Sequence, residues 1–303
     1  MAGQLDLFDP SFVYPSSKRR GRRRNELLEV MQLTLVVARR RLSDYACPRS
    51  KHTFTQPQLL ACLVLRAFKK LTYRGTTELL EASDALREVL GLDRVPAHTT
   101  LIEFARKLSP NLLDQLIGEV LLVLQEKGLV VHEVAIDSTG VETRAASTHY
   151  LSRSGGKRSG YLKLALAVAC TSIVLISATA NAGPDNDLAE APHLLWRSAT
   201  RCSPDWLLAD AGYDAEKVHR FCRSWNVISY IPPVPKTTDG TIKSGEGRIR
   251  CGRHRPYLSG RRWSVESFIS GLKRTCGWTL AARSQPALKV EAMLKALAYA
   301  IRR

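Results

Sequence analysis

Three acidic residues, far apart in the sequence, are of the type and in the places that metal-dependent chemistry requires. Two apolar strand-like segments end in aspartate, "VAID" at Asp137 and "LLAD" at Asp210, and small residues and glycine follow each of them. Open α/β sheets usually place ligand chemistry at the carboxyl ends of their strands, although aspartate also starts turns for local reasons. The third acid, Glu266, lies in the segment "RRWSVESFISGLKR".

The segment 261–274 predicts a helix with an apolar face and a charged face beside it. Apolar residues at the spacing i, i+3, i+4 and i+7 predict a face buried against a core. These residues are Val265, Phe268, Ile269 and Leu272. On the neighbouring edge, Glu266 lies between two cations, Arg262 and Lys273. This edge is compatible with a solvated ion-pair face or with a functional carboxylate.

The connection between the two aspartates favours the functional interpretation. A single predicted helix precedes the Asp210 strand, so a right-handed crossover can place that strand parallel to the Asp137 strand. Neighbouring strands lie about 4.8 Å apart, and two unpaired carboxylates across such a gap would force one of them to take up a proton. A divalent cation removes this conflict, and Mg²⁺ prefers carboxylate and phosphate oxygens.

Together with Glu266, the two aspartates supply enough ligands for two metal ions about 3.5 to 4 Å apart. In such a site one ion activates a water molecule or a 3′-hydroxyl, and the other stabilises the leaving oxygen. Arg262 and Lys273 would then point toward phosphates. The sequence therefore predicts a phosphodiester-cleaving centre at Asp137, Asp210 and Glu266.

Residues 26–130 predict a helical region before the strands begin. Capping signals mark several helix starts: Thr55 with Gln58, Thr100 with Glu103, and Ser109 with Pro110. Gly91 and Gly128 stand where helices should end. Residues 83–108 predict two short helices around a turn, which is compatible with a helix-turn-helix or with an ordinary small bundle.

After residue 130 the periodicity predicts strands and helices in alternation. The expected strands are 129–137, 161–170, 172–180, 205–210 and 227–233, and the expected helices are 185–199, 215–225 and 261–274. The pattern predicts an α/β fold with a mixed five-stranded sheet and flanking helices. The uncharged run 164–180 is slightly short for a bilayer, and Thr171-Ser172 divides it, so we expect a buried β-hairpin.

The charge of the chain predicts a polyanionic partner. Lys and Arg number 45 against 28 Asp and Glu, a formal net charge of +17, which favours nucleic acid over an anionic membrane once the hairpin is accepted. Residues 1–25 predict a disordered arm with a dense basic run, which would lie along phosphates or serve as a solubilising tail. The basic residues of this run are Lys18, Arg19, Arg20, Arg22, Arg23 and Arg24.

Residues 236–262 form a second basic segment, with eight cations against two acids, and Arg253 and Arg255 belong to it. We expect a loop that clamps DNA beside Glu266, with a solvated insertion as the alternative. Seven cysteines without a CxxC pair indicate a reducing cytosol rather than a disulfide framework. The first twenty residues lack a secretory h-region.

The ordered set of motifs resembles a DDE-type insertion-sequence transposase of the retroviral-integrase or ribonuclease-H-like superfamily, in the group with the signature Tyr-x2-Arg-x3-Glu-x6-Lys. Arg262, Glu266 and Lys273 fit this spacing, whereas Ser259 occupies the tyrosine position and Tyr257 lies two residues earlier. "PAHTTLIEFARKL", "GYLKLALAV" with its Lys163, and "GPDNDLAEAPHLL" also resemble the group. The resemblance covers most of the chain from about residue 50.

The resemblance implies a ribonuclease-H-like fold, with Mg²⁺ or Mn²⁺ held by Asp137, Asp210 and Glu266. It divides the chain into an arm (1–25), a helical DNA-binding domain (26–130) and a catalytic domain (131–303). It further implies binding of double-stranded DNA at terminal inverted repeats, hydrolysis that frees a 3′ end, attack of that 3′-hydroxyl on target DNA, a homodimer, and a nucleoid-associated protein of the prokaryotic cytoplasm. The alternatives are a non-catalytic DNA-binding descendant and a structure-selective nuclease on the same fold.

Other patterns carry weaker signals. His219 with Cys222, and Cys251 with His254, have zinc-ligand spacing, but we interpret both pairs as chance. Trp225, Trp263 and Trp278 are compatible with stacking on bases or, more commonly, with core packing. The sequence contains no P-loop and no GxGxxG motif, so we expect no nucleotide cofactor.

Overall fold

The computed structural model describes residues 25–49, 51–143, 161–183, 187–233, 245 and 260–303. The basic run 18–24 and most of the basic segment 236–262, with Arg253 and Arg255, lie outside the described residues. The predictions for them therefore stay predictions.

The first part of the chain is helical, as its sequence predicts. Its helices are α1 (Glu26–Arg39), α2 (Gln56–Phe68), α3 (Tyr73–Glu81), α4 (Asp84–Leu90), α5 (His98–Lys107) and α6 (Pro110–Glu126). Both hydrogen bonds of the capping box between Thr55 and Gln58 are present at the start of α2, and Ser109 caps α6. The two expected helices around a turn are α4 and α5, and Gly91 ends α4 with a left-handed φ of 61°.

The predicted capping box at Thr100 and Glu103 is wrong. Helix α5 already begins at His98, and Ala97 occupies its N-cap position without a side-chain cap. Thr100 therefore lies inside the first turn of the helix, where its hydroxyl cannot serve as the N-cap.

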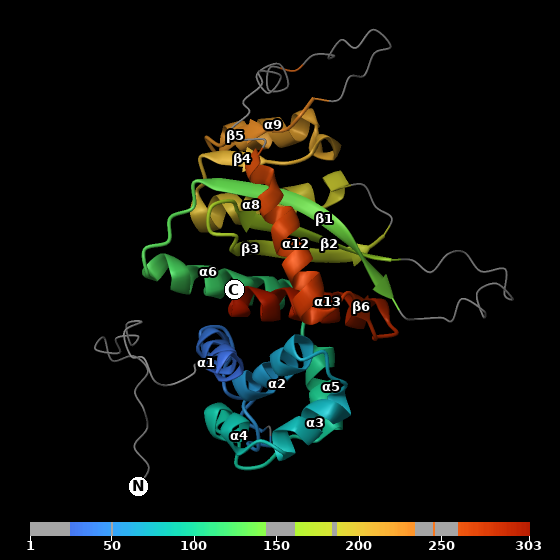
Figure 1. Ribbon diagram of the computed structural model, residues 1–303. Coiled ribbons are helices and arrows are strands. Elements are labelled where there is room, and N and C mark those ends of the chain that lie inside the picture. Colours follow the sequence, from blue (N-terminus) through green and yellow to red (C-terminus); the bar gives the residue numbers. More distant parts are fainter. Residues whose placement is uncertain (1–24, 50, 144–160, 184–186, 234–244, 246–259) are drawn as a thin grey trace, which may run out of the picture.

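The second part of the chain forms a mixed sheet in the order β3-β2-β1-β4-β5 (Figure 1). Its strands are β1 (Glu133–Thr143), β2 (Leu162–Ala169), β3 (Leu175–Ala182), β4 (Trp206–Leu208) and β5 (Ile228–Tyr230). Strand β2 is antiparallel to β1 and β3, while β4 is parallel to both β1 and β5. The predicted hairpin and the predicted parallel return of the Asp210 strand beside the Asp137 strand are both confirmed. A sixth, unpredicted strand, β6 (Thr279–Leu280), pairs with the end of β1.

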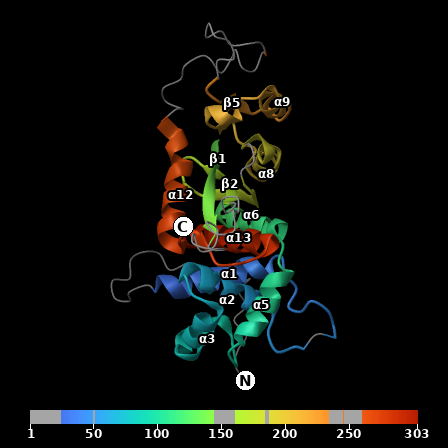
Figure 2. The same cartoon turned by 90° about the vertical axis from the view of Figure 1, so that its right-hand side faces the viewer.

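Helices cover both faces of the sheet. Helix α12 (Trp263–Cys276) lies on one face, and α8 (Ala191–Cys202) and α9 (Glu216–Ser224) lie on the other (Figure 2). Three short 3₁₀ turns complete this part: η1 (Asp187–Ala189), η2 (Ala211–Tyr213) and η3 (Gly260–Arg262). The mixed sheet with flanking helices behind an all-helical region confirms the predicted fold class.

Strand β2 explains why both faces bury apolar surface. Its side chains alternate between the two faces, with the larger ones toward the α12 side and alanines toward the α8 side. Leu162, Leu164, Leu166 and Val168 belong to the core cluster that contains Val265 and Phe268 of α12, and Ala165, Ala167 and Ala169 belong to the cluster that contains Leu194 of α8. Every residue of β2 is buried, and apart from Lys163 all of them are apolar, as expected for a strand that is covered on both faces.

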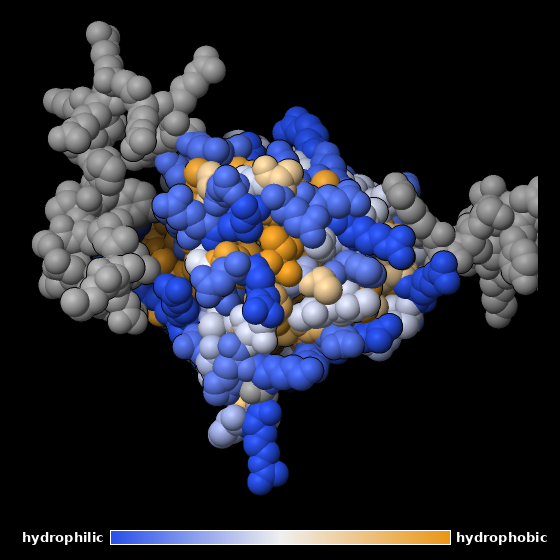
Figure 3. Space-filling view, turned by 90° about the horizontal axis from the view of Figure 1, so that it is seen from below, coloured by the Kyte–Doolittle hydropathy of each residue, from blue (hydrophilic) through white to orange (hydrophobic). Residues whose placement is uncertain are grey.

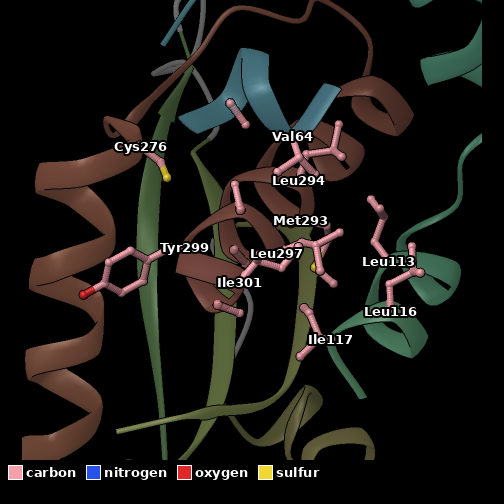
Figure 4. Close-up of a cluster of buried hydrophobic side chains, with 14 of the residues drawn as sticks. Val64, Leu113, Leu116, Ile117, Cys276, Met293, Leu294, Leu297, Tyr299 and Ile301 are labelled. Atoms are coloured by element: carbon pink, nitrogen blue, oxygen red, sulfur yellow. The ribbon is translucent and has the colours of Figure 1, made fainter. Parts of the chain in front are cut away.

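The larger core continues from the sheet into the helical region. Helix α13 (Gln285–Arg302) lies between them (Figure 1), and its Leu294, Leu297 and Met293 pack among Val64 of α2 and Ile117 of α6 (Figure 4). Helix α6 also packs directly on β3. Residues on the two sides of the predicted boundary at 130 therefore share one core.

A buried carboxylate, that of Asp114 on α6, connects this helix to β3 and α8. It accepts hydrogen bonds from Ser177 Oγ at 2.8 Å and from the Ala178 N–H at 3.0 Å, both on β3. Its Oδ2 lies 3.1 Å from Arg197 Nε and 2.9 Å from Arg201 Nη2, both on α8. Asp114 is only 1% exposed, so its charge depends on these partners.

Hydrophilic side chains surround a smaller group of hydrophobic ones on the face formed by the N-terminal helices (Figure 3). Among the described helices, none is both long and apolar enough to cross a membrane. The cysteines within the described ranges form no disulfide.

Candidate active site

Asp137 lies within a strand and not at its end, so that detail of the sequence analysis is wrong. Strand β1 continues to Thr143 because β2 keeps pairing with it, from Ser138 opposite Ala165 to Val141 opposite Leu162. On its other edge, β4 pairs only with residues 133–135 of β1. Asp137 therefore lies just beyond the point where β4 ends, which places it beside the carboxyl end of that strand.

Asp210 follows β4 by two residues and begins the turn η2. Its carboxylate accepts a hydrogen bond from the Gly212 N–H at 2.9 Å and caps that turn. Because β4 runs parallel to β1 and stops beside it, the topology brings Asp210 to the same edge as Asp137. The predicted placement of these two residues at one gap in the sheet is thus reproduced by the strand pairing.

A buried chain of hydrogen bonds supports the turn that carries Asp210. Asp214, at the end of η2, lies 3.2 Å from His219 Nε2, and His219 Nδ1 lies 2.7 Å from Ser229 Oγ on β5. His219 is fully buried, and Cys222 belongs to the core. His219 therefore stabilises the turn through buried hydrogen bonds, and Cys222 packs in the core. Cys251 and His254 lie outside the described residues.

Glu266 reaches the site from α12, whose apolar face packs on β1 and β2. Val265, Phe268 and Leu272 are completely buried, and Ile269 is 8% exposed, so the predicted buried face is confirmed. The side chain of Glu266 is 52% exposed. The helix therefore anchors itself by one face and presents Glu266 on another.

Arg262 lies between two of the acids. Its Nη2 is 2.6 Å from Glu266 Oε1, and its Nη1 is 3.9 Å from Asp137 Oδ2. One guanidinium group thus partly neutralises carboxylates that come from β1 and from α12. The sequence spacing predicts the contact with Glu266, but no sequence signal pointed to the contact with Asp137.

The environment of Asp137 disfavours its ionised form. Burial raises the pKa of Asp137 above its usual value, and the negative charges of Asp210 and Glu266 act in the same direction. The Ser138 N–H, which donates to Oδ1 at 2.7 Å, and the charge of Arg262 only partly offset this rise in pKa. The three acids are therefore close enough for Asp210 and Glu266 to influence the charge of Asp137.

The three acids offer donors for a metal ion, but they are not arranged as a finished site. Within the ranges that the structure describes, no three His, Cys, Asp or Glu side chains stand close enough together to hold a metal ion as they are. The available donors are nevertheless carboxylate oxygens, which Mg²⁺ and Mn²⁺ prefer. A cation would offset the burial, and the repulsion by Asp210 and Glu266, that raise the pKa of Asp137. The donor set therefore fits a divalent cation, provided that Arg262 and the side chains rearrange.

The other two predicted phosphate ligands among the described residues take different positions. Lys273 Nζ lies 4.4 Å above the ring of Trp278, and Trp278 Nε1 donates to the Gly140 carbonyl at 2.6 Å. Lys163 is only 4% exposed, and its Nζ lies 3.5 Å from Glu190 Oε2. This geometry corrects the prediction for Lys163, because a buried, ion-paired ammonium group is not presented to a phosphate at the surface.

The tryptophans also differ from one another. Trp263, which starts α12, is 56% exposed, and Trp225 is 43% exposed, whereas Trp278 fixes the end of α12 to β1 through Gly140. Trp278 therefore has a packing role. Trp263 and Trp225 leave a ring surface open to solvent, as stacking on a base would require.

Comparison with known proteins provides a separate line of information. The family described as "Transposase DDE domain" matches residues 132–301, which is more than half of the chain. No curated protein matches the sequence. Among solved structures, the chain is similar to the piggyBac transposase in a synaptic complex with hairpin DNA, with a TM-score of 0.45 and 10% identity over 91% of this chain and 71% of that chain.

Proposed function

Because this chain belongs to the transposase DDE domain family, we propose that it cleaves DNA at transposon ends and transfers the freed 3′-hydroxyl into target DNA. The observation that carries the proposal is the arrangement of three acids from separate parts of the sequence. Asp137 lies on β1, Asp210 follows the adjacent parallel strand β4, and both Asp210 and Glu266 influence the pKa of Asp137. This arrangement supports the proposal, because carboxylates are the ligands that phosphodiester chemistry with divalent cations needs.

Asp137, Asp210 and Glu266 would hold the Mg²⁺ or Mn²⁺ ions. When bound, a pair of such ions supplies an activated water or 3′-hydroxyl and stabilises the leaving oxygen. The protein contributes the positions of the carboxylates: β1 fixes Asp137, the capped turn fixes Asp210, and the buried face of α12 fixes Glu266. Arg262, once it leaves the carboxylates, would be free to pair with a phosphate through its planar fork of donors.

DNA is the proposed partner, and the net charge of +17 supports it. The protein would bind terminal inverted repeats and target DNA, and the synapsis of two ends would call for a homodimer. The basic run 18–24 would add phosphate contacts. The resemblance to insertion-sequence transposases further suggests that the protein acts at the nucleoid of a prokaryotic cytoplasm.

One reaction separates this proposal from its alternatives. Purified protein is incubated with Mg²⁺ and labelled duplexes that carry the DNA flanking its own coding region, with EDTA in a parallel sample. Metal-dependent nicking followed by strand joining is the expected result. Binding without nicking would support a non-catalytic DNA-binding protein, and nicking without joining would support a structure-selective nuclease.

The position of Arg262 leads to a testable prediction about metal binding. The Arg262→Gln variant should bind Mn²⁺ more tightly in the absence of DNA, because the guanidinium no longer competes for Asp137 and Glu266. A partly exposed ion pair contributes about 0.2 to 1 kcal/mol, so the affinity should rise by up to about fivefold. Isothermal titration calorimetry with MnCl₂ measures this change.

Arg274→Gln is the matched control for this experiment. Arg274 lies on the same helix and is exposed, so its replacement should leave the Mn²⁺ affinity unchanged. If the Arg262 variant binds Mn²⁺ as the wild type does or more weakly, Arg262 does not compete with a cation.

A further inference from the structure

A basic cleft lies between the helical region and the segment that connects α12 to α13. It has a volume of about 790 Å³, and residues of α2, of the turn before α3, of α5, of β6 and of α13 line it. Five of the lining residues are cations and one, Glu291, is an acid. The cations are Arg66, Lys70, Arg106, Arg283 and Lys295.

Three of these cations are fixed within the protein. Lys295 donates to the carbonyls of Cys276, Gly277 and Thr279, and Lys70 donates to the Arg274 carbonyl at 2.9 Å. Arg66 pairs with Glu291 at 3.3 Å. The walls of the cleft are therefore tied together across the helical region and the end of α12.

The corner that carries Arg283 is also held in place. Glu291 Oε2 accepts hydrogen bonds from the N–H groups of Ala281 and Ala282, each at 2.9 Å. Because Glu291 is itself paired with Arg66, these bonds connect the corner to α2. The backbone just before Arg283 is therefore held by hydrogen bonds. Arg106 of α5 also lines the cleft, and both arginines are exposed.

Two independent features indicate that the cleft takes an anion. Arg66 is only 8% exposed, and its guanidinium lies 4.2 Å from the centre of the Tyr73 ring. Its Nε has no hydrogen-bond partner in the described structure, and an unsatisfied buried donor is costly. In addition, the N-terminal turn of the 18-residue helix α13 lines the cleft through Ser284 and Ala287, and the Ser284 side chain does not cap the helix. A helix N-terminus presents free N–H groups and a partial positive charge to anions.

We propose that this basic cleft binds the sugar-phosphate backbone of the DNA that leaves the active site, an inference that rests on the proposed function. Glu266 and Cys276, which lines the cleft, are ten residues apart on α12, so they are separated by about 15 Å along the helix. This separation corresponds to roughly four or five nucleotides at about 3.4 Å each. Lys273 stands between them on the same helix, so the positive charge continues from the carboxylates to the cleft.

The test removes the two exposed cations of the cleft. The Arg106→Gln/Arg283→Gln double variant and the wild type are compared for binding to a labelled duplex of arbitrary sequence, between roughly 50 and 200 mM salt. The slope of log affinity against log salt is negative, and each lost phosphate contact makes it about 0.9 less steep. The magnitude of the slope should therefore decrease by about 1.8 in the cleft variant. Lys217→Gln/Arg220→Gln removes the same charge from exposed positions on α9, on the opposite face of the sheet from α12 (Figure 2), and should leave the slope unchanged.

The outcomes separate this inference from the proposed function. A smaller slope in the cleft variant alone, with nicking still detected, supports the cleft as a backbone site. If the wild type nicks DNA but the cleft variant keeps its slope, or both double variants lose slope equally, the cleft inference is overturned and the proposed function stands. If the wild type neither binds nor nicks DNA, both are overturned.

Discussion

Replacing Asp137 by asparagine is expected to reduce Mg²⁺-dependent nicking by about a thousandfold or more and to leave DNA affinity nearly unchanged. The substitution keeps the shape of the side chain and an oxygen that accepts from the Ser138 N–H. It removes one of the three carboxylates that we propose as metal ligands. Metal ions contribute several kcal/mol to such reactions, and each 1.36 kcal/mol is a factor of ten in rate. Single-turnover nicking and fluorescence anisotropy measure the two quantities separately.

The same variant should be more stable than the wild type when no metal is present. Burial, with the charges of Asp210 and Glu266, raises the pKa of Asp137 in the folded protein. A raised pKa means that the fold favours the protonated form, and this contribution to stability is lost as the pH rises through the folded-state pKa. At neutral pH the ionised carboxylate therefore costs stability, and asparagine removes that cost.

Thermal unfolding in EDTA at neutral pH tests this second effect, and the Asp137→Asn variant should have the higher Tm. Added Mn²⁺ should raise the Tm of the wild type and have little effect on that of the variant. Asp93→Asn, at an exposed turn position, is the control and should change neither nicking nor Tm. A variant that keeps its nicking rate would show that Asp137 is not a metal ligand. A variant that unfolds at a lower temperature than the wild type in EDTA would show that the charge of Asp137 does not destabilise the fold.

Asp114→Ala is expected to cause the largest loss of stability, about 3 to 5 kcal/mol, because it leaves the side chains of Arg197 and Arg201 without their buried counter-charge. It also removes the acceptor for Ser177 and Ala178, so α6 loses its polar connection to β3. Urea denaturation at neutral pH measures this loss. Asp93→Ala, at an exposed position, should have an effect close to zero.

The pH dependence of stability gives Asp114 a signature opposite to that of Asp137. Burial alone would raise the pKa of Asp114, but His193, Arg201, the Ala178 N–H and Ser177 outweigh burial and lower it. A lowered folded-state pKa contributes stability above the unfolded pKa of about 3.9, and this contribution disappears as the pH falls through the folded-state value. The wild type should thus lose stability in acid over this window, and Asp114→Ala should lose less. An equal loss in both would contradict the role given to Asp114.

The sequence predicted the frame of the site because that frame depends on periodicity and chain connection. The uncharged run 164–180, divided by Thr171-Ser172, indicated a buried hairpin, and one crossover helix before β4 predicted the parallel pairing with β1. The spacing of Phe268 and Leu272 predicted which face of α12 would be buried. All three predictions are confirmed.

The details that the sequence did not predict depend on partners distant in the chain. Strand β1 extends beyond Asp137 because β2 is long enough to pair with it, and β6 has only two residues, too few for a period. The contact of Arg262 with Asp137 joins residues on α12 and β1. Lys163 is buried because Glu190, 27 positions later, supplies a partner inside the fold.

The most direct test of the proposed mechanism is to locate manganese in a complex of the protein with cleavable-end DNA, using anomalous X-ray diffraction. We expect two Mn²⁺ ions about 3.5 to 4 Å apart, with oxygens of Asp137, Asp210 and Glu266 among their ligands and Arg262 moved from the carboxylates to a phosphate. Manganese bound elsewhere, with Arg262 still between Asp137 and Glu266 in the DNA complex, would contradict the proposed active site.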